Sequence, residues 1–74
     1  MSDEEKIWRL KIEADNADDK STLFALITII ATFGSGPAKS HTVDALMSIA
    51  NSKEDKDVKQ AALDAIARIN VSKK

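Results

Sequence analysis

Apolar side chains recur along this chain at the spacing of three and four residues that gathers them on one face of an α-helix. In the first such segment, roughly residues 3–14, the apolar face carries Ile7, Leu10 and Ala14. The spacing recurs in two further segments, at about residues 37–50 and 56–69. Their apolar faces consist of Val43, Leu46, Met47 and Ala50, and of Val58, Ala62, Ala65, Ile66 and Ile69.

The remaining segment is unusual because no ionisable side chain occurs from Ser21 through Ala38. It contains the run STLFALITIIATF, whose isoleucines and threonines favour β-strands. The run is longer than most strands, however, and no second strand-like segment exists to pair with it. We therefore predict a second helix that ends at Gly34-Ser35-Gly36-Pro37, which holds the only glycines and the only proline of the chain. The expected fold class is all-α, with four short helices.

The two halves of the chain match each other when the sequence is shifted by 36 residues. Seven of the 28 pairs between residues 7–34 and 43–70 are identical. The identities are Leu10/Leu46, Ala14/Ala50, Asp19/Asp55, Lys20/Lys56, Ala25/Ala61, Ile30/Ile66 and Ala31/Ala67. Because they stay in phase across two helices and a loop, each half is predicted to form a helical hairpin.

A length of 74 residues allows one domain, residues 1–74. Within it we place repeat 1 at about residues 3–34, repeat 2 at about residues 37–70, and a frayed tail at residues 71–74. The two antiparallel hairpins are expected to stack, as in a fragment of an α-solenoid or in a small bundle.

Residues 42–70 resemble a HEAT repeat. The second helix of that family opens with Asp, carries Val and a basic residue just inside, and continues with an alanine-rich apolar stripe. Asp55, Val58 and Lys59 take these places here, while Lys56 stands where the family often has proline. The resemblance implies Asp55 as N-cap, Val58 turned inward, and a right-handed stack of hairpins that binds other proteins. Since a solenoid normally needs about three units, it also implies a missing neighbour, for which a second copy of the chain is one candidate.

The repeat shows how the second helix departs from the fourth. Where the fourth has Lys59, Gln60, Asp64 and Arg68, the second has Leu23, Phe24, Thr28 and Thr32. The fourth helix is amphipathic, with Asp64 and Arg68 spaced for an ion pair. The second is apolar nearly all round, apart from a weakly polar strip formed by Ser21, Ala25, Thr28 and Thr32. Such a helix is either a central core helix packed by the other three or a patch that docks another chain.

Two side chains of the first helix join this candidate surface. Trp8 and Ile12 lie one turn apart and beside the apolar stripe. Trp8 either caps the open end of the core or anchors a partner, because tryptophan is favoured at binding hot spots. The candidate interaction surface therefore consists of Trp8, Ile12, Leu23, Phe24, Ile27 and Thr28.

Charge and composition exclude several classes of partner. The net charge is −1, and lysine and arginine are scattered, which argues against a nucleic-acid partner. The apolar run is shorter than the roughly 20 residues that span a membrane. The acidic N-terminus lacks the basic region of a signal peptide, so we expect a cytoplasmic protein.

No motif points to catalysis, a cofactor or a metal. His41 is the only histidine and there is no cysteine, so neither a usual metal site nor a catalytic dyad can be assembled. Acidic residues cluster in the loops at residues 15–19 and 54–57. A calcium loop over residues 15–26 would place Lys20 and Leu26 where glycine and glutamate are required. These carboxylates are therefore expected to cap helices or to be solvated on the surface.

We predict a small non-catalytic protein–protein interaction module, which binds a protein partner or self-associates through its uncharged second helix. An alternative within binding is a small inhibitor or immunity-type regulator of one target protein. The rival from another class is an enzyme or a metal-binding protein that uses the acidic loops.

Overall fold

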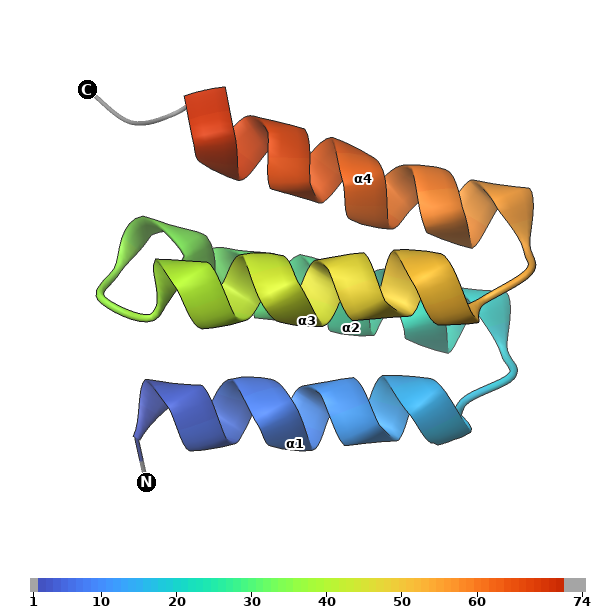
Figure 1. Ribbon diagram of the computed structural model, residues 1–74. Coiled ribbons are helices and arrows are strands. Elements are labelled where there is room, and N and C mark those ends of the chain that lie inside the picture. Colours follow the sequence, from blue (N-terminus) through green and yellow to red (C-terminus); the bar gives the residue numbers. More distant parts are fainter. Residues whose placement is uncertain (1, 72–74) are drawn as a thin grey trace.

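The computed structural model describes residues 2–71 as α-helices joined by short turns (Figure 1). The helices are α1 (Asp3–Asn16), α2 (Lys20–Ala31), α3 (Lys39–Ser52) and α4 (Lys56–Val71), and a short 3-10 helix, η1 (Thr32–Ser35), follows α2. Residues 2–71 contain no strand. The predicted all-α fold class is confirmed.

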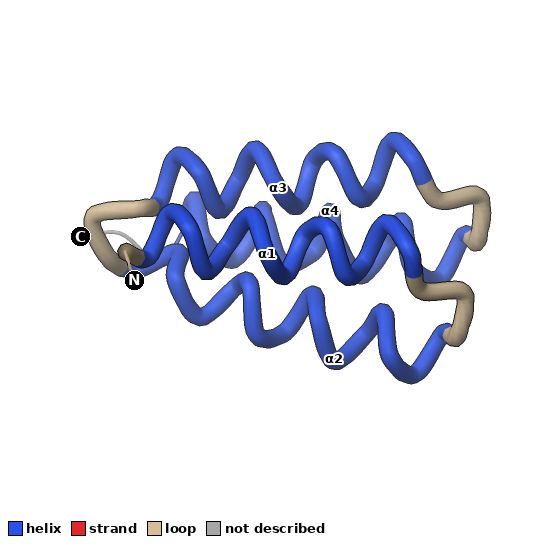
Figure 2. Tube along the Cα trace, turned by 90° about the horizontal axis from the view of Figure 1, so that it is seen from below, coloured by secondary structure: helices blue, strands red, loops and turns tan. Residues whose placement is uncertain are grey.

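The helices form two antiparallel hairpins that lie against each other. α1 and α2 make the first hairpin, and α3 and α4 make the second; α1 contacts α3, and α2 contacts α4. α1 and α3 run in the same direction, and α2 and α4 run back, so the second hairpin repeats the first (Figure 1). Both hairpin loops lie at one end of the molecule, called here the loop end, and the α2–α3 connection lies at the other, the terminal end (Figure 2).

Side chains cap the starts of α1, α2 and α4. Ser2 and Glu5 form a reciprocal capping box at the start of α1. Asp19 accepts a hydrogen bond from the Thr22 backbone N–H at 3.0 Å. Asp55 accepts from the backbone N–H of Val58 at 3.1 Å. The expected N-cap role of Asp55 is therefore confirmed, and Asp19 plays the same part in the first hairpin.

The ends of two helices differ from the prediction. α3 begins at Lys39 and not at Pro37, because the backbone of Ala38 is not yet helical and the Lys39 N–H closes a turn onto Gly36. α2 ends at Ala31, where the chain tightens into η1. The Thr32 hydroxyl donates to the carbonyl of Ile29 at 2.6 Å, a local bond by which threonine competes with helix geometry.

The C-terminal ends of α1 and α4 also extend beyond the predicted bounds. α1 continues through Asn16, and α4 continues through Val71, which was assigned to the tail. Residues 72–74, the rest of that expected tail, lie outside the described residues.

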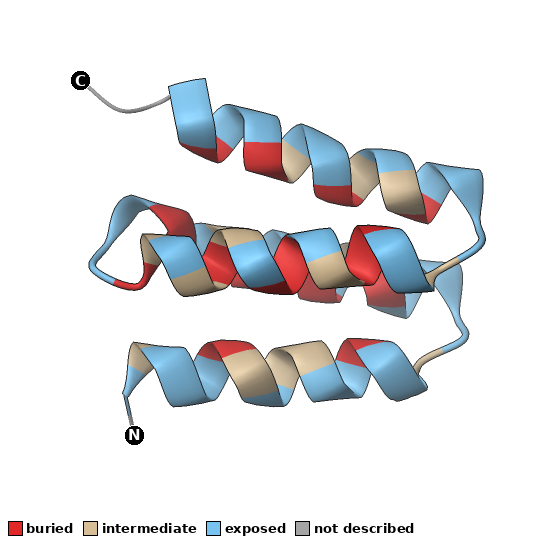
Figure 3. Cartoon of the chain, in the orientation of Figure 1, coloured by how far each residue is buried: buried red, intermediate tan, exposed pale blue. Residues whose placement is uncertain are grey.

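One hydrophobic core is shared by all four helices. Its largest fully buried side chains are Ile7, Ile30, Leu46, Ile49, Val58 and Thr42, which come from both hairpins. The buried surfaces of the helices face the middle of the molecule (Figure 3). The Thr42 hydroxyl donates to the Ala38 carbonyl at 3.1 Å, so this buried polar side chain is satisfied by the N-cap residue of its own helix. Neither hairpin therefore has a core of its own.

Gly34 lets η1 approach the end of α4 closely. It is buried, and a Cβ atom placed on it would lie 2.5 Å from Cγ1 and 2.6 Å from Cδ1 of Ile69. Ile69 is itself buried and branched at Cβ, so its side chain has little freedom to move aside. At Gly36 the nearest atom to such a Cβ is 3.9 Å away.

We expect Gly34→Ala to destabilise the protein by about 1–3 kcal/mol, because the added methyl group overpacks the contact with Ile69. Gly36→Ala is the matched control, since its methyl group makes only an ordinary van der Waals contact with the Phe33 carbonyl oxygen and its backbone conformation suits any residue. Thermal unfolding followed by circular dichroism measures both variants. Equal stability of the two would show that η1 does not pack on α4 as described.

Candidate functional site

The second helix is part of the core on one side and part of the surface on the other. α2 contacts each of the other three helices. Its buried side chains are Leu23, Leu26, Ile27 and Ile30. The weakly polar strip predicted from the helical wheel is exposed at each of its positions, Ser21, Ala25, Thr28 and Thr32. The core-helix interpretation therefore holds for one side of α2, while the other side stays uncovered within residues 2–71.

This division corrects two members of the candidate interaction surface. Only 4% of Leu23 and 3% of Ile27 is exposed, so both belong to the core. The helical wheel could not separate them from surface positions, because apolar side chains surround most of α2. Phe24 is half-buried and Thr28 is exposed, and these two remain on the surface.

Phe24 and Thr28 line a groove of about 560 Å³ between α2 and α4. From α2 and η1 the lining includes Phe24, Ile27, Thr28, Ala31 and Thr32. From α4 it includes Ala61, Asp64, Ala65, Arg68 and Ile69. Gly34 and Ser35 of η1 also line it. We call this hollow the α2–α4 groove.

Small residues make the groove. Ala61 and Ala65 stand one turn apart on the α4 wall, and Gly34 adds no side chain beside them. Larger side chains at these places would fill the space between the helices. The shared core holds α2 and α4 against each other, so the groove is present in the chain alone.

The charged side chains of the groove come from α4. Asp64 accepts a hydrogen bond from the Gln60 amide at 2.9 Å, one turn earlier on the same helix. The ion pair expected between Asp64 and Arg68 is not formed. The Arg68 side chain has no hydrogen-bond or ion-pair partner among residues 2–71. The groove therefore offers a free guanidinium at one edge, opposite the uncharged wall of α2.

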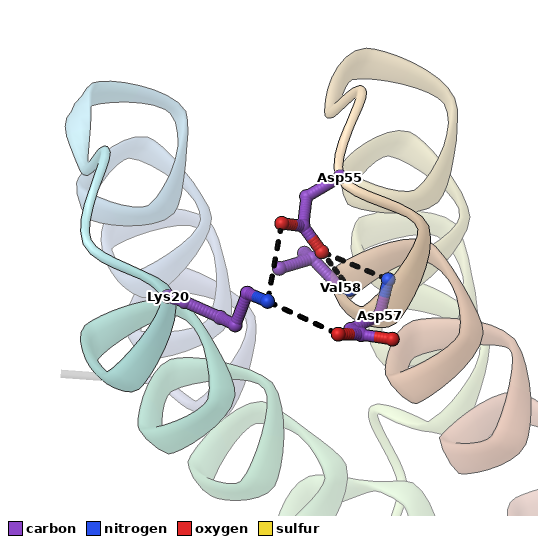
Figure 4. A network of polar contacts seen from close by, with 4 residues as sticks. All are labelled: Lys20, Asp55, Asp57 and Val58. Carbon is purple, nitrogen blue, oxygen red and sulfur yellow. Dashed lines mark hydrogen bonds and ion pairs between the residues drawn. The ribbon is translucent and has the colours of Figure 1, made fainter.

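An ion-pair network joins α2 and α4 at the loop end of the molecule (Figure 4). The Lys20 ammonium lies 3.0 Å from a carboxylate oxygen of Asp57 and 3.4 Å from one of Asp55. Its hydrogen bond to Asp57, together with the nearby charge of Asp55, raises the pKa of Lys20. The hydrogen bond from the Val58 backbone N–H, with a further one from Asp57, lowers the pKa of Asp55. The network thus ties the two hairpins together where α2 and α4 begin.

Trp8 and Ile12 lie away from the α2–α4 groove. Trp8 is half-buried, packs against the core, and meets the ring of His41 edge-on with 6.5 Å between ring centroids. The Nε2 atom of His41 lies 3.6 Å from a carboxylate oxygen of Glu4. Ile12 is 57% exposed. The candidate residues of α1 and those of α2 therefore do not form one continuous surface in the groove.

Four of the acidic loop residues act within the fold. Besides the caps provided by Asp19 and Asp55, Asp15 pairs with Lys11 at 2.7 Å and Asp57 with Lys20. Among residues 2–71 no three acidic, histidine or cysteine side chains lie close enough together to hold a metal ion.

The α4 side of the groove was not among the predicted site residues. A signal for it was present, because Thr28 and Thr32 align with Asp64 and Arg68 in the internal repeat, and all four line the groove. Equivalent faces of the two hairpins thus meet across one hollow.

Comparison with known proteins does not identify the chain: no protein-family model, no curated protein and no solved structure matches it. The HEAT-like resemblance therefore stays a prediction that rests on the residues quoted above. None of the helices in residues 2–71 has the length and apolar character needed to cross a membrane.

We expect Ile27→Ala to lower the free energy of unfolding by about 2–5 kcal/mol, because it leaves a cavity in the shared core. Thr28→Ala, one residue further on, is expected to change it by no more than about 0.5 kcal/mol, since Thr28 is exposed. Urea denaturation provides both values. A large loss for Thr28→Ala or a negligible one for Ile27→Ala would reverse the assignment of the two sides of α2.

Acid should weaken the fold through Asp55. Because the pKa of Asp55 is lowered in the folded protein, the stabilisation that its carboxylate provides is complete above the pKa of the unfolded chain, about 3.9. This stabilisation is lost as the pH falls through the pKa of the folded protein. We expect the melting temperature at low salt to fall below about pH 4. Asp55→Asn keeps an N-cap acceptor and removes the charge, so the melting temperature of this variant should fall less steeply with pH. Identical pH profiles for the two proteins would contradict this role of Asp55.

Proposed function

We propose that this chain is a small non-catalytic protein-interaction module, and that a partner protein binds it in the α2–α4 groove. The observation that supports the proposal is the groove itself, which has one uncharged wall and one wall with a free arginine. The HEAT-like resemblance points the same way, since stacks of such hairpins bind other proteins. The cytoplasmic location expected from the sequence stays a prediction.

The shape of the groove suits an amphipathic helix of the partner. Its walls are α2 and α4, which come from different hairpins and run in the same direction (Figure 1). On the α4 wall, Ala61 and Ala65 leave room for inserted apolar side chains. Helices that dock in such grooves place anchors at every third or fourth position into the hollow. Phe24, which is half-buried, provides an aromatic contact beside this hollow.

The charges of the groove indicate the character of the partner. Arg68 is free to pair with a carboxylate, and its planar guanidinium suits a bidentate contact. Asp64 already accepts a bond from Gln60. We therefore expect the partner helix to carry an acidic residue next to its apolar stripe.

The lining of the groove gives no support to catalysis. Its ionisable side chains are Asp64 and Arg68, and it contains neither histidine nor cysteine. An acid and a guanidinium on successive turns of one helix provide neither an activated nucleophile nor a general base beside one. A regulator that masks a single target remains the second candidate, since the same groove would serve it.

Site-specific photo-crosslinking in the native host tests the proposal. A benzoylphenylalanine at position 24 should crosslink to a defined protein, because this residue lies in the groove. The same probe at Asn51, which is exposed on α3 and outside the groove, is the matched control and should not capture that protein. Adding Thr28→Arg should abolish the crosslink at position 24 by blocking the hollow.

The outcome depends on folding, which circular dichroism checks for every variant. Thr28→Arg changes an exposed side chain, so its melting temperature should match that of the unsubstituted protein. A crosslink that survives Thr28→Arg, or one that forms equally from position 51, would refute binding in the groove.

A further inference from the structure

Equivalent positions of the two hairpins differ in burial. On one outer face of the molecule the residues of the second hairpin are the more exposed, and on the other outer face those of the first hairpin are. Leu63 of α4 is 43% exposed, whereas its equivalent in the first hairpin, Ile27, is 3% exposed. Val43 is half-buried, whereas its equivalent Ile7 is fully buried. The first hairpin has a neighbour on this side, and the second has none among residues 2–71. We call the uncovered surface of Val43, Met47 and Leu63 the trailing face.

The first hairpin shows the reverse difference on its own outer side. Lys6, Arg9, Leu10, Ile29 and Phe33 line a second groove of about 330 Å³. Their equivalents in the second hairpin are Thr42, Ala45, Leu46, Ala65 and Ile69, and each of these is buried or half-buried. The second groove thus occupies the place where a preceding hairpin would sit. We call this surface the leading face.

We propose that a second copy of this chain occupies the leading face through its trailing face, so that copies stack head to tail. The contact repeats the one between the two hairpins of a single chain. The apolar side chains Met47 and Leu63 of one copy then lie against Leu10, Ile29 and Phe33 of the next. This goes beyond the proposed function, because none of these five apolar side chains lines the α2–α4 groove.

The ion-pair network of the loop end supports this arrangement (Figure 4). Within the chain, Lys20 of the first hairpin reaches across to Asp55 and Asp57 of the second. In the internal repeat, Lys20 is equivalent to Lys56, and Asp55 is equivalent to Asp19. The Lys56 side chain is exposed, and its ammonium has no hydrogen-bond or ion-pair partner among residues 2–71. In the stack this ammonium meets Asp19 of the next copy, as Lys20 meets Asp55 at 3.4 Å, and Ser21 takes the place of Asp57.

The remaining charges of the two faces are also complementary. At the loop end, Glu13 stands near the end of α1 beside the leading face. Lys59, whose ammonium also donates to the Ala50 carbonyl at 2.8 Å, stands near the start of α4 beside the trailing face. At the terminal end, Lys6 and Arg9 of the leading face are set against Asp44 of the trailing side. Opposite signs therefore meet at the loop end, while at the terminal end the two basic side chains offset the acidic Asp44 and Glu5.

The copies associate more weakly than the two hairpins within a chain. Lys6 and Arg9 stand where the internal contact has Thr42 and Ala45, so two long side chains must fold aside. Within the chain, Trp8 contacts His41. The equivalent residues between two copies are Asp44 and Glu5, whose like charges repel each other. The stack is therefore expected to depend on concentration and on salt.

Sedimentation velocity of the full chain, from about 10 µM to about 1 mM, tests the stack. The mean mass should rise above the monomer mass of 8.0 kDa and pass beyond two copies, because a head-to-tail contact leaves a free face at each end. Raising the salt from about 0.05 M to about 0.5 M should reduce the mass, since exposed charges are screened. A monomer at every concentration would overturn the proposal.

A mixing experiment distinguishes this contact from a symmetric dimer. Leu63→Glu blocks the trailing face and Ile29→Glu blocks the leading face; the two residues are 43% and 46% exposed and neither belongs to the buried core, so the fold should tolerate the change. Each variant alone should be monomeric, whereas an equal mixture should form a complex of two chains and nothing larger. A mixture that stays monomeric, or one variant that still dimerises by itself, would overturn the head-to-tail contact.

Two further variants separate assembly from folding and from the groove. Lys56→Glu should weaken the stack by removing the ammonium that meets Asp19, yet a glutamate at the start of α4 favours the helix, so unfolding cannot explain the loss. Phe24→Ala should leave the stack intact, because Phe24 lies on neither face and its equivalent Gln60 does not line the groove between the hairpins. Loss of assembly with Phe24→Ala, or none with Lys56→Glu, would contradict the assignment of the faces.

Discussion

The contact between the two hairpins is the constraint on which the rest of the structure depends. Each hairpin has two helices and an apolar side, and the fully buried side chains of the core come from both hairpins. A chain of this size has a small core and no cysteine for a disulfide. The core therefore forms only when Ile7 and Ile30 of the first hairpin meet Leu46, Ile49 and Val58 of the second.

That contact also determines where the surface of the molecule is asymmetric. The two hairpins are similar in sequence, yet each covers only one side of the other, so a leading and a trailing face remain. The groove between α2 and α4 arises because the same contact places two equivalent helices side by side, with alanines on the α4 wall. Protein binding in the groove and stacking of copies are thus proposals about separate surfaces of one scaffold.

Most of the fold could be predicted from local patterns. Apolar spacing indicates the helices, and the match of Asp19 with Asp55 indicates two hairpins whose second helices begin alike. The inner and outer sides of α2 could not be predicted, because a helix that is apolar nearly all round gives no direction, and so Leu23 and Ile27 were assigned to the surface. The close approach of Gly34 to Ile69 joins residues far apart in the sequence, so no local pattern indicates it.

Hydrogen exchange of the native chain, measured residue by residue by NMR, tests most directly whether the two hairpins share one core. Under conditions where exchange reports the free energy of opening, the slowest amides in α1, α2, α3 and α4 should all exchange through the same global unfolding, with one common free energy. Slow amides in one hairpin and distinctly faster ones throughout the other would show that a hairpin opens alone. That result would contradict a groove held in place by a core that both hairpins build.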